Sequence, residues 1–140
     1  MMMESETAIA TIEKNRMARR IKMIQGSSVD PLVLGKVREI AKKHKKIMVV
    51  LDSNHSHEHV FRELELYSPY VTKNSYLIVF DTAIEDITEA RGNRPWGKGN
   101  NPKTAVWKFL KSNKNFAVDN VFDDKLLISV APSGYLKRIS

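Results

Sequence analysis

The chain has 140 residues, of which 42% are hydrophobic and 28% are charged, and it contains no cysteine. This length and apolar fraction are typical of one domain with a single core. The absence of cysteine excludes disulfides, thiolate metal sites and cysteine nucleophiles. No apolar run approaches the roughly 20 residues of a membrane-spanning helix, and the N-terminus does not have the pattern of a secretory signal. We therefore expect a soluble, cytoplasmic protein.

The net charge of +7 is concentrated near the N-terminus. Residues 1–46 hold 11 of the 23 Lys and Arg residues but only 5 of the 16 Asp and Glu residues. A basic region can bind nucleic acid, although charge on one side of a chain more often marks a solvated helix face. Because no aromatic residue interrupts the basic stretch 16–46, we do not expect nucleic acid to be the partner.

The first third of the chain predicts a strand followed by a helix. We expect residues 1–20 to form a polar, weakly helical segment and residues 21–140 to form the folded domain. Ile21–Gln25 is apolar enough for a short strand. Asp30 followed by Pro31 is typical of a helix N-cap and first helical position, and apolar residues recur behind them at helical spacing.

The rest of the chain alternates between strand-like and helix-like patterns. Strands are predicted at 47–51 and 76–80, helices at 57–67 and from Asn101-Pro102 onward, a Gly, Asn and Pro-rich loop at 90–101, and an antiparallel hairpin over 116–130 around Asp123-Asp124. The two continuous apolar runs are typical of strands that are buried on both faces. The pattern predicts an α/β fold of order βαβαβ, with a mostly parallel sheet and a C-terminal antiparallel hairpin.

Acidic residues end both of the buried strands. Asp52 follows the first strand and Asp81 follows the second, so neighbouring parallel strands would bring them to the same edge of the sheet. Together with the amide of Asn54 they offer the oxygen ligands that Mg²⁺ prefers. The alternative is that Asp52 and Asn54 only cap the next helix and that Asp81 begins a turn. The pattern leaves both interpretations open.

Three of the four histidines lie at His55, His57 and His59. A metallo-hydrolase would need the spacing H-x-H-x-D-H and further histidines downstream, and a non-haem iron site would need an H-x-D pair, so neither pattern is matched. His55 opens the helix at the predicted ligand edge and is the better candidate for a base near neutral pH. His57 falls on the apolar face, where a buried, hydrogen-bonded histidine is the more common outcome.

The glycine-rich loop at 92–101 does not have the pattern of a nucleotide-binding loop. It contains a G-x-G, but no strand precedes it and no Lys-Ser ending follows. With Arg94 and Trp96 it could cover a substrate or contact another subunit, and the sequence leaves both possibilities open.

The His-rich block resembles a known family. Leu51–Val60, with Tyr67-Ser68-Pro69, Asp81-Thr82 and the ending Lys125–Leu136, is similar to the cephalosporin hydroxylase / rhamnosyl O-methyltransferase family over about residues 16–138. The resemblance implies a Rossmann-like class I methyltransferase fold. It also implies S-adenosylmethionine as the methyl donor and a hydroxyl of a sugar or small metabolite as the acceptor.

The resemblance also implies roles for particular residues. Gly26, Ser27 and Ser28 match the loop that lies against the adenine of the donor. Asp52, Asn54 and Asp81 match the metal-site region, with His55 and His57 as the catalytic candidates. Many relatives have Asp at the position of Asn54 and Glu at the position of Phe80, so we expect this chain to bind Mg²⁺ less strongly.

The resemblance places this chain in the C-terminal part of such an enzyme. None of its glycines forms the glycine-rich turn that approaches the donor, and its first strand would be the family's third. Because missing neighbours would expose the edges of the sheet, we expect a homo-oligomer or a partner chain to cover them. The alternative function is therefore a non-catalytic fragment or subunit that pairs with another chain.

Overall fold

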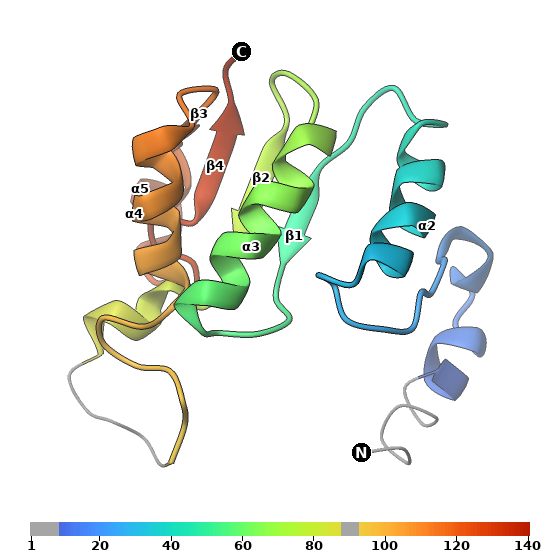
Figure 1. The fold of residues 1–140 in the computed structure, drawn as a ribbon, viewed down its shortest axis with the longest axis horizontal. Helices are drawn as coiled ribbons and strands as arrows, with labels where there is room; N and C mark the ends of the chain where they lie inside the picture. The colour runs from blue at the N-terminus through green and yellow to red at the C-terminus, as the bar shows by residue number, and fades with distance from the viewer. Residues whose placement is uncertain (1–8, 88–92) are drawn as a thin grey trace.

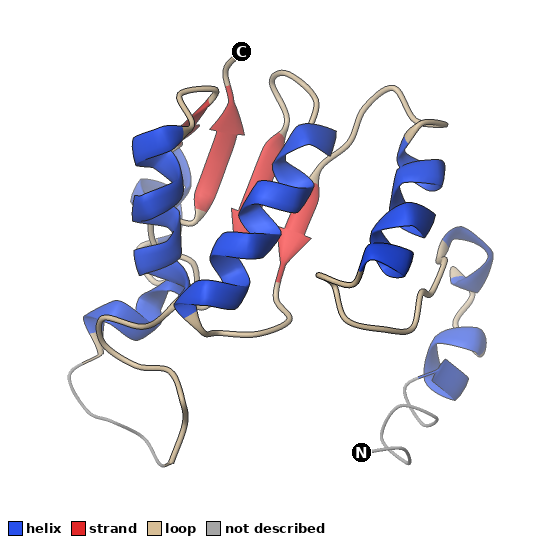
Figure 2. Cartoon of the chain, in the orientation of Figure 1, coloured by secondary structure: helices blue, strands red, loops and turns tan. Residues whose placement is uncertain are grey.

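The computed structural model describes residues 9–87 and 93–140, in which helices pack on a four-stranded mixed sheet (Figures 1 and 2). The strands are β1 (Val49–Leu51), β2 (Tyr76–Val79), β3 (Phe116–Val118) and β4 (Tyr135–Arg138), in the spatial order β1-β2-β4-β3. β1 and β2 are parallel, whereas β4 is antiparallel to both of its neighbours. The predicted α/β class is confirmed, but the prediction of a mostly parallel sheet is wrong.

The helices include α2 (Pro31–Ala41), α3 (His57–Tyr67), α4 (Pro102–Ser112) and α5 (Val121–Leu126), with 3-10 turns η1 (Ala18–Arg20), η2 (Ser68–Tyr70) and η3 (Thr82–Asp86). Two of them, α2 and α4, begin where local capping signals predict them. The Asp30 side chain accepts a hydrogen bond from Leu32 N at the start of α2. Asn101 and Thr104 form a reciprocal capping box at the start of α4. Both helices have proline at the first position, so these predicted N-termini are confirmed.

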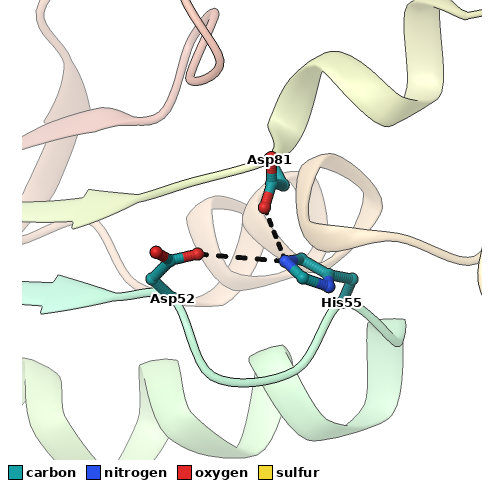
Figure 3. A group of neighbouring side chains, drawn as sticks. All are labelled: Asp52, His55 and Asp81. Atoms are coloured by element: carbon teal, nitrogen blue, oxygen red, sulfur yellow. Dashed lines mark ion pairs between the residues drawn. The ribbon is translucent and has the colours of Figure 1, made fainter. Parts of the chain in front are cut away.

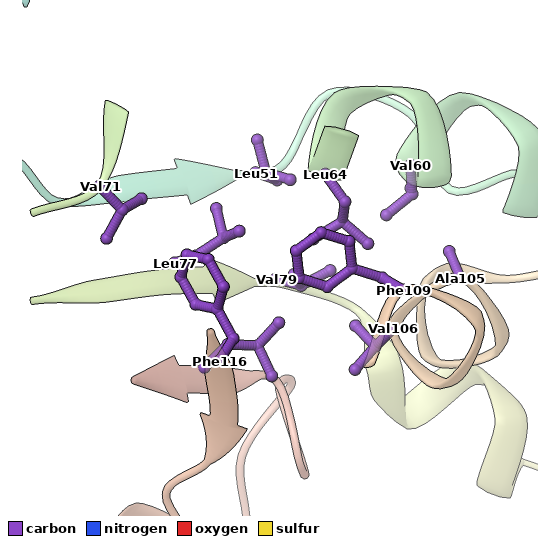
Figure 4. Close-up of a cluster of buried hydrophobic side chains, with 11 residues drawn as sticks. Leu51, Val60, Leu64, Val71, Leu77, Val79, Ala105, Val106, Phe109 and Phe116 are labelled. Atoms are coloured by element: carbon purple, nitrogen blue, oxygen red, sulfur yellow. The ribbon is translucent and has the colours of Figure 1, made fainter. Parts of the chain in front are cut away.

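The core lies between the sheet and the two helices α3 and α4 (Figures 1 and 4). Its buried members are Leu51, Val60, Leu64, Val71, Leu77, Val79, Ala105, Val106, Phe109, Phe116 and Leu136. The opposite face is covered by α5 near β4, where the Phe122 ring stacks on Tyr135 at a centroid distance of 4.5 Å and meets Tyr76 edge-on at 5.4 Å. Alternate residues of β2 and β4 therefore face the core on one side of the sheet and α5 on the other.

The predicted strand at 21–25 is wrong. These residues form no strand, and residues 22–25 line one wall of a cleft of about 930 Å³ whose other wall is α2. Ile21 and Met23 are both more than 40% exposed. The physical reason is the lack of a pairing partner, because a strand needs a neighbouring strand to satisfy its backbone groups and none lies beside this segment in the described part of the chain.

β1 is not buried on both faces, which corrects the interpretation of the apolar run 47–51. Leu51 is buried, whereas Val50 points away from the core and is 46% exposed. Within the described residues β1 pairs only with β2, so it is an edge strand. A single apolar run therefore does not distinguish a central strand from an edge strand whose second face is uncovered.

The predicted hairpin over 116–130 is also wrong in its second strand. α5 occupies Val121–Leu126, and β3 pairs instead with β4 at Tyr135–Arg138. Asp119 accepts a hydrogen bond from Val121 N, which turns the chain toward α5 immediately after β3. The antiparallel pairing at the C-terminal end is confirmed, but its connection is a helix and a loop.

Parts of two predicted segments, residues 1–8 of the N-terminal segment and residues 90–92 of the glycine-rich loop, lie outside the described residues. None of the described helices is long and apolar enough to cross a membrane.

Candidate functional site

The candidate site lies at the carboxyl ends of β1 and β2 (Figure 3). Asp52 directly follows β1, and Asp81 lies two residues after Val79 at the end of β2. The two strands are parallel and in register, with Leu51 opposite Val79, so both acids reach the same edge of the sheet. This is the edge at which ligands bind in open α/β sheets.

His55 lies between the two carboxyl groups. Its Nε2 is 2.5 Å from Asp81 Oδ2 and 3.9 Å from Asp52 Oδ1. One ligand atom from each of the three residues falls within 4.8 Å of the others. The Nε2 atom is shielded from solvent yet makes no hydrogen bond of acceptable direction in the described chain. A buried nitrogen without a hydrogen bond, facing two carboxyl groups, is the geometry of a site that can accept a further group.

The backbone at Asp81 is also unusual. Asp81 has φ 58° and ψ 23°, in the left-handed region, and it is the residue before η3. Asp and Asn adopt this region more readily than other non-glycine residues. The turn directs the carboxyl group back toward His55 (Figure 3).

The donor atoms of this cluster fit a divalent cation. Two carboxylate oxygens suit Mg²⁺ and Mn²⁺, and the imidazole nitrogen shifts the preference toward Mn²⁺ or another transition metal. Phe80, which directly precedes Asp81, has no ligand atom. The residues that could hold a cation are therefore Asp52, Asp81 and His55.

A loop with Trp96 lies against this cluster. The Trp96 ring centroid is 5.1 Å from that of His55, and the Arg94 guanidinium lies 6.0 Å from the Trp96 ring. Asn100 Oδ1 accepts a hydrogen bond of 2.9 Å from His57 N, which ties the loop to the start of α3. The Trp96 ring therefore packs beside the His55 ring of the cluster.

Glu85 anchors the same end of this loop. Its Oε2 accepts hydrogen bonds from Gly99 N at 2.8 Å and from the Asn101 side-chain amide. The hydrogen bond from the Gly99 backbone, followed by that from Asn101, lowers the pKa of the Glu85 carboxyl. The carboxylate form is therefore favoured in the folded chain.

This lowered pKa predicts a pH-dependent contribution to stability. Because the folded-state pKa lies below the ordinary value of 4.5, the stabilisation is present above that value and is lost as the pH falls through the lowered pKa. Glu85→Gln should therefore reduce the drop in melting temperature between about pH 7 and about pH 3, measured by circular dichroism. Identical pH profiles for the variant and the wild type would contradict this prediction.

The other residues predicted for the site have protein partners. Asn54 Oδ1 accepts hydrogen bonds from the backbone N and the hydroxyl of Ser56, at 2.9 and 2.8 Å. The His57 Nδ1 atom lies 2.7 Å from Thr104 Oγ1 on α4. The amide thus supports the turn before α3, and His57 joins α3 to α4.

The predicted donor loop at Gly26, Ser27 and Ser28 lies near the end of β1. Gly26 has φ 135°, and a Cβ atom there would come within 2.6 Å of Val33 Cγ2, so glycine is required where the loop meets α2. The Ser28 hydroxyl contacts Ser53 and His59 at 3.4 and 3.1 Å.

Sequence reasoning did not single out three residues near this loop: Ser53, His59 and Glu63. The signal that could have found them is their spacing, because His59, Glu63 and Tyr67 follow one another every four residues and so share one side of a helix.

Comparison with known proteins identifies a family. The family model described as Rhamnosyl O-methyltransferase/CmcI matches residues 4–139. Curated proteins named rhamnosyl O-methyltransferase from Mycobacterium bovis (strain BCG / Pasteur 1173P2) and Mycobacterium tuberculosis (strain ATCC 25618 / H37Rv) are each 28% identical over 120 residues, which cover 84% of this chain and 47% of the relative. A Mycobacterium leprae protein of the same name is 33% identical over 63 residues, covering 44% of this chain and 28% of the relative. No solved structure matches significantly.

These matches confirm the resemblance that rests on the His-rich block. The chain spans about half the length of the curated mycobacterial relatives, 47% in the longer matches.

Proposed function

Because the chain belongs to the rhamnosyl O-methyltransferase/CmcI family, we propose that it takes part in S-adenosylmethionine-dependent methyl transfer to a hydroxyl of a sugar or related small metabolite. The observation that carries this proposal is the cluster of Asp52, His55 and Asp81 at the carboxyl ends of two parallel strands. The names of the mycobacterial relatives support a sugar hydroxyl as the acceptor.

In this proposal the acidic residues and His55 have separate roles. Asp52 and Asp81 would hold Mg²⁺ or Mn²⁺, which when bound lowers the pKa of an acceptor hydroxyl. His55, left out of the ligand set in this proposal, would accept the hydroxyl proton at Nε2. That nitrogen faces both carboxyl groups and makes no hydrogen bond in the described chain. The acceptor oxygen then forms a bond to the methyl carbon while the carbon–sulfur bond of the donor breaks. Positioning supplies much of the rate of such a displacement. A catalytic role for His57 stays a prediction.

The donor would lie beside the loop at Gly26, Ser27 and Ser28. This loop precedes α2 and contacts the end of β1 through Ser28. The proximity of the loop to Asp52 supports a donor and an acceptor that meet at one edge of the sheet.

Calorimetric titration with S-adenosylmethionine tests this proposal. We expect the 140-residue chain to bind the donor with a Kd in the micromolar range, about −8 kcal/mol, and more tightly with Mg²⁺ or Mn²⁺ present. S-adenosylhomocysteine is the matched ligand without the transferable methyl group and should bind similarly. A folded chain that binds neither compound would contradict a donor site formed by this chain alone.

A second candidate function is a subunit that pairs with another chain. The observation that favours it is the edge of β1 with which no other described strand pairs. Met48, just before β1, is 56% exposed, and Val50 within it is 46% exposed. Unpaired strand edges with exposed apolar side chains readily accept another strand. In this case the chain would bind no donor alone, and light scattering would show self-association or a complex with the chain that supplies the missing strands.

A further inference from the structure

A second polar cluster lies between α3 and the loop at 26–28, and its members have no chemical role in the proposed methyl transfer. We call it the Ser53 cluster, and its members are Ser28, Ser53, His59 and Glu63. Ser53 Oγ donates a 2.7 Å hydrogen bond to Glu63 Oε1. The His59 Nε2 atom lies 3.2 Å from Ser53 Oγ and 3.1 Å from Ser28 Oγ. Three separate segments therefore meet at these side chains.

Glu63 is the buried end of this cluster. Glu63 is 2% exposed, and its Oε2 atom has no hydrogen-bond partner in the described chain. A buried carboxyl group with one unsatisfied oxygen is unfavourable compared with an apolar residue of similar size. An apolar side chain would pack at this position at less cost, so packing alone does not account for a glutamate here.

Tyr67 extends the cluster by one more turn of α3. Its hydroxyl donates a 2.7 Å hydrogen bond to the backbone oxygen of Ser28. Burial, and then the charge of Glu63, raise the pKa of Tyr67, so the hydroxyl keeps its proton. Both the side chain and the backbone of Ser28 are thus held by α3.

The cluster joins the two parts of the proposed site. Ser28 belongs to the predicted donor loop, and Ser53 directly follows Asp52. Resting on the proposed function, we propose that Glu63 is a positioning residue that, through Ser53 and His59, sets the donor loop relative to the cation-binding edge.

The weak packing of α2 explains why the hydrogen bonds of the Ser53 cluster matter for the position of the loop at 26–28. Val33 is the only buried residue of α2, and Leu32 on the same helix is 78% exposed. Apolar contacts therefore hold the loop at 26–28 only weakly, and its position depends on the hydrogen bonds made by Ser28. Loss of those bonds should release the loop without unfolding the sheet.

Hydrogen–deuterium exchange and donor titration together test this proposal. Ser28→Ala and Glu63→Gln should each raise the exchange rate of amides 26–34 about fivefold, the factor expected for one lost hydrogen bond, and leave amides of α4 unchanged. Glu65→Gln is the matched control on α3, where Glu65 is exposed and pairs with Arg62. This control should not alter the exchange.

The second readout separates positioning from stability. The Kd of S-adenosylmethionine should rise about fivefold in both cluster variants and stay unchanged in Glu65→Gln. Unchanged exchange at 26–34 in Ser28→Ala and in Glu63→Gln would overturn the proposal, whether or not the donor binds. If the wild-type chain binds no donor, the proposed function fails, and the exchange data still decide whether the cluster holds the loop. Should Glu63→Gln not fold, Ser28→Ala alone carries the test.

Discussion

Asp81→Asn is expected to weaken the binding of Mn²⁺ or Tb³⁺ by about tenfold or more, since the number of charged ligands sets the affinity of such sites. Asparagine keeps the shape of the side chain and, like aspartate, tolerates the left-handed backbone conformation at φ 58°. The variant therefore changes the charge of the ligand and not the turn. The effect should be on cation affinity, with the melting temperature close to that of the wild type.

Sensitised Tb³⁺ luminescence measures this affinity without any turnover. The Trp96 ring lies 5.1 Å from the His55 ring, so an ion held by the cluster would be close enough to receive excitation from Trp96. Trp107→Phe removes the other tryptophan, which lies on α4 and is 48% exposed, and it provides the background for all titrations. Trp96→Phe should remove the signal while the ion still binds.

Asp86→Asn is the matched control for this prediction. Asp86 belongs to the same 3-10 turn as the residues after Asp81, but its carboxyl group is exposed and pairs with Lys103 at 2.7 Å. This control should leave the luminescence titration unchanged. Equal Tb³⁺ affinity in Asp81→Asn and the wild type would show that Asp81 is not a ligand.

The sequence predicts well those features that depend on neighbouring residues. The N-termini at Asp30-Pro31 and Asn101-Pro102 are local, because the capping side chain and the proline lie within one turn of the groups they satisfy. The meeting of Asp52 and Asp81 is also predictable, since it follows from two apolar runs in parallel strands.

Features that depend on distant partners could not be predicted in this way. Ile21–Gln25 has the composition of a strand but no strand beside it in the described chain, and Val50 is apolar although nothing in the described chain covers it. The partner of β3 lies beyond α5, so its pairing could not be read from the adjacent residues. Glu63 was not identified because its hydrogen-bond partner, Ser53, lies outside α3, in the loop that follows β1.

The Asp81 turn also depends on a contact that sequence patterns do not show. Gly134 precedes β4, and its backbone oxygen accepts a 2.9 Å hydrogen bond from Val79 N. A Cβ atom at Gly134 would lie 2.2 Å from Val79 O and 3.1 Å from Ala131 O. Both neighbours are backbone atoms, so neither can move without moving β2 or the turn before β4.

Gly134→Ala is therefore expected to lower the free energy of unfolding by about 3 kcal/mol or more, at the upper end of overpacking effects. Urea unfolding followed by circular dichroism measures this change. Gly35→Ala is the matched control, because no atom lies within 4 Å of its added Cβ and the position is within α2. That variant should raise stability by about 0.5–1 kcal/mol through helix propensity.

The same substitution links the sheet to the site. Val79 lies two residues before Asp81, so a displacement of the end of β2 also displaces the carboxyl group that faces His55. If Gly134→Ala remains folded, we expect both its Tb³⁺ affinity and its stability to fall. Gly35→Ala should lower neither the Tb³⁺ affinity nor the stability. Stability within about 0.5 kcal/mol of the wild type would contradict the close approach. The antiparallel pairing of β2 with β4 would then not be what fixes the position of Asp81.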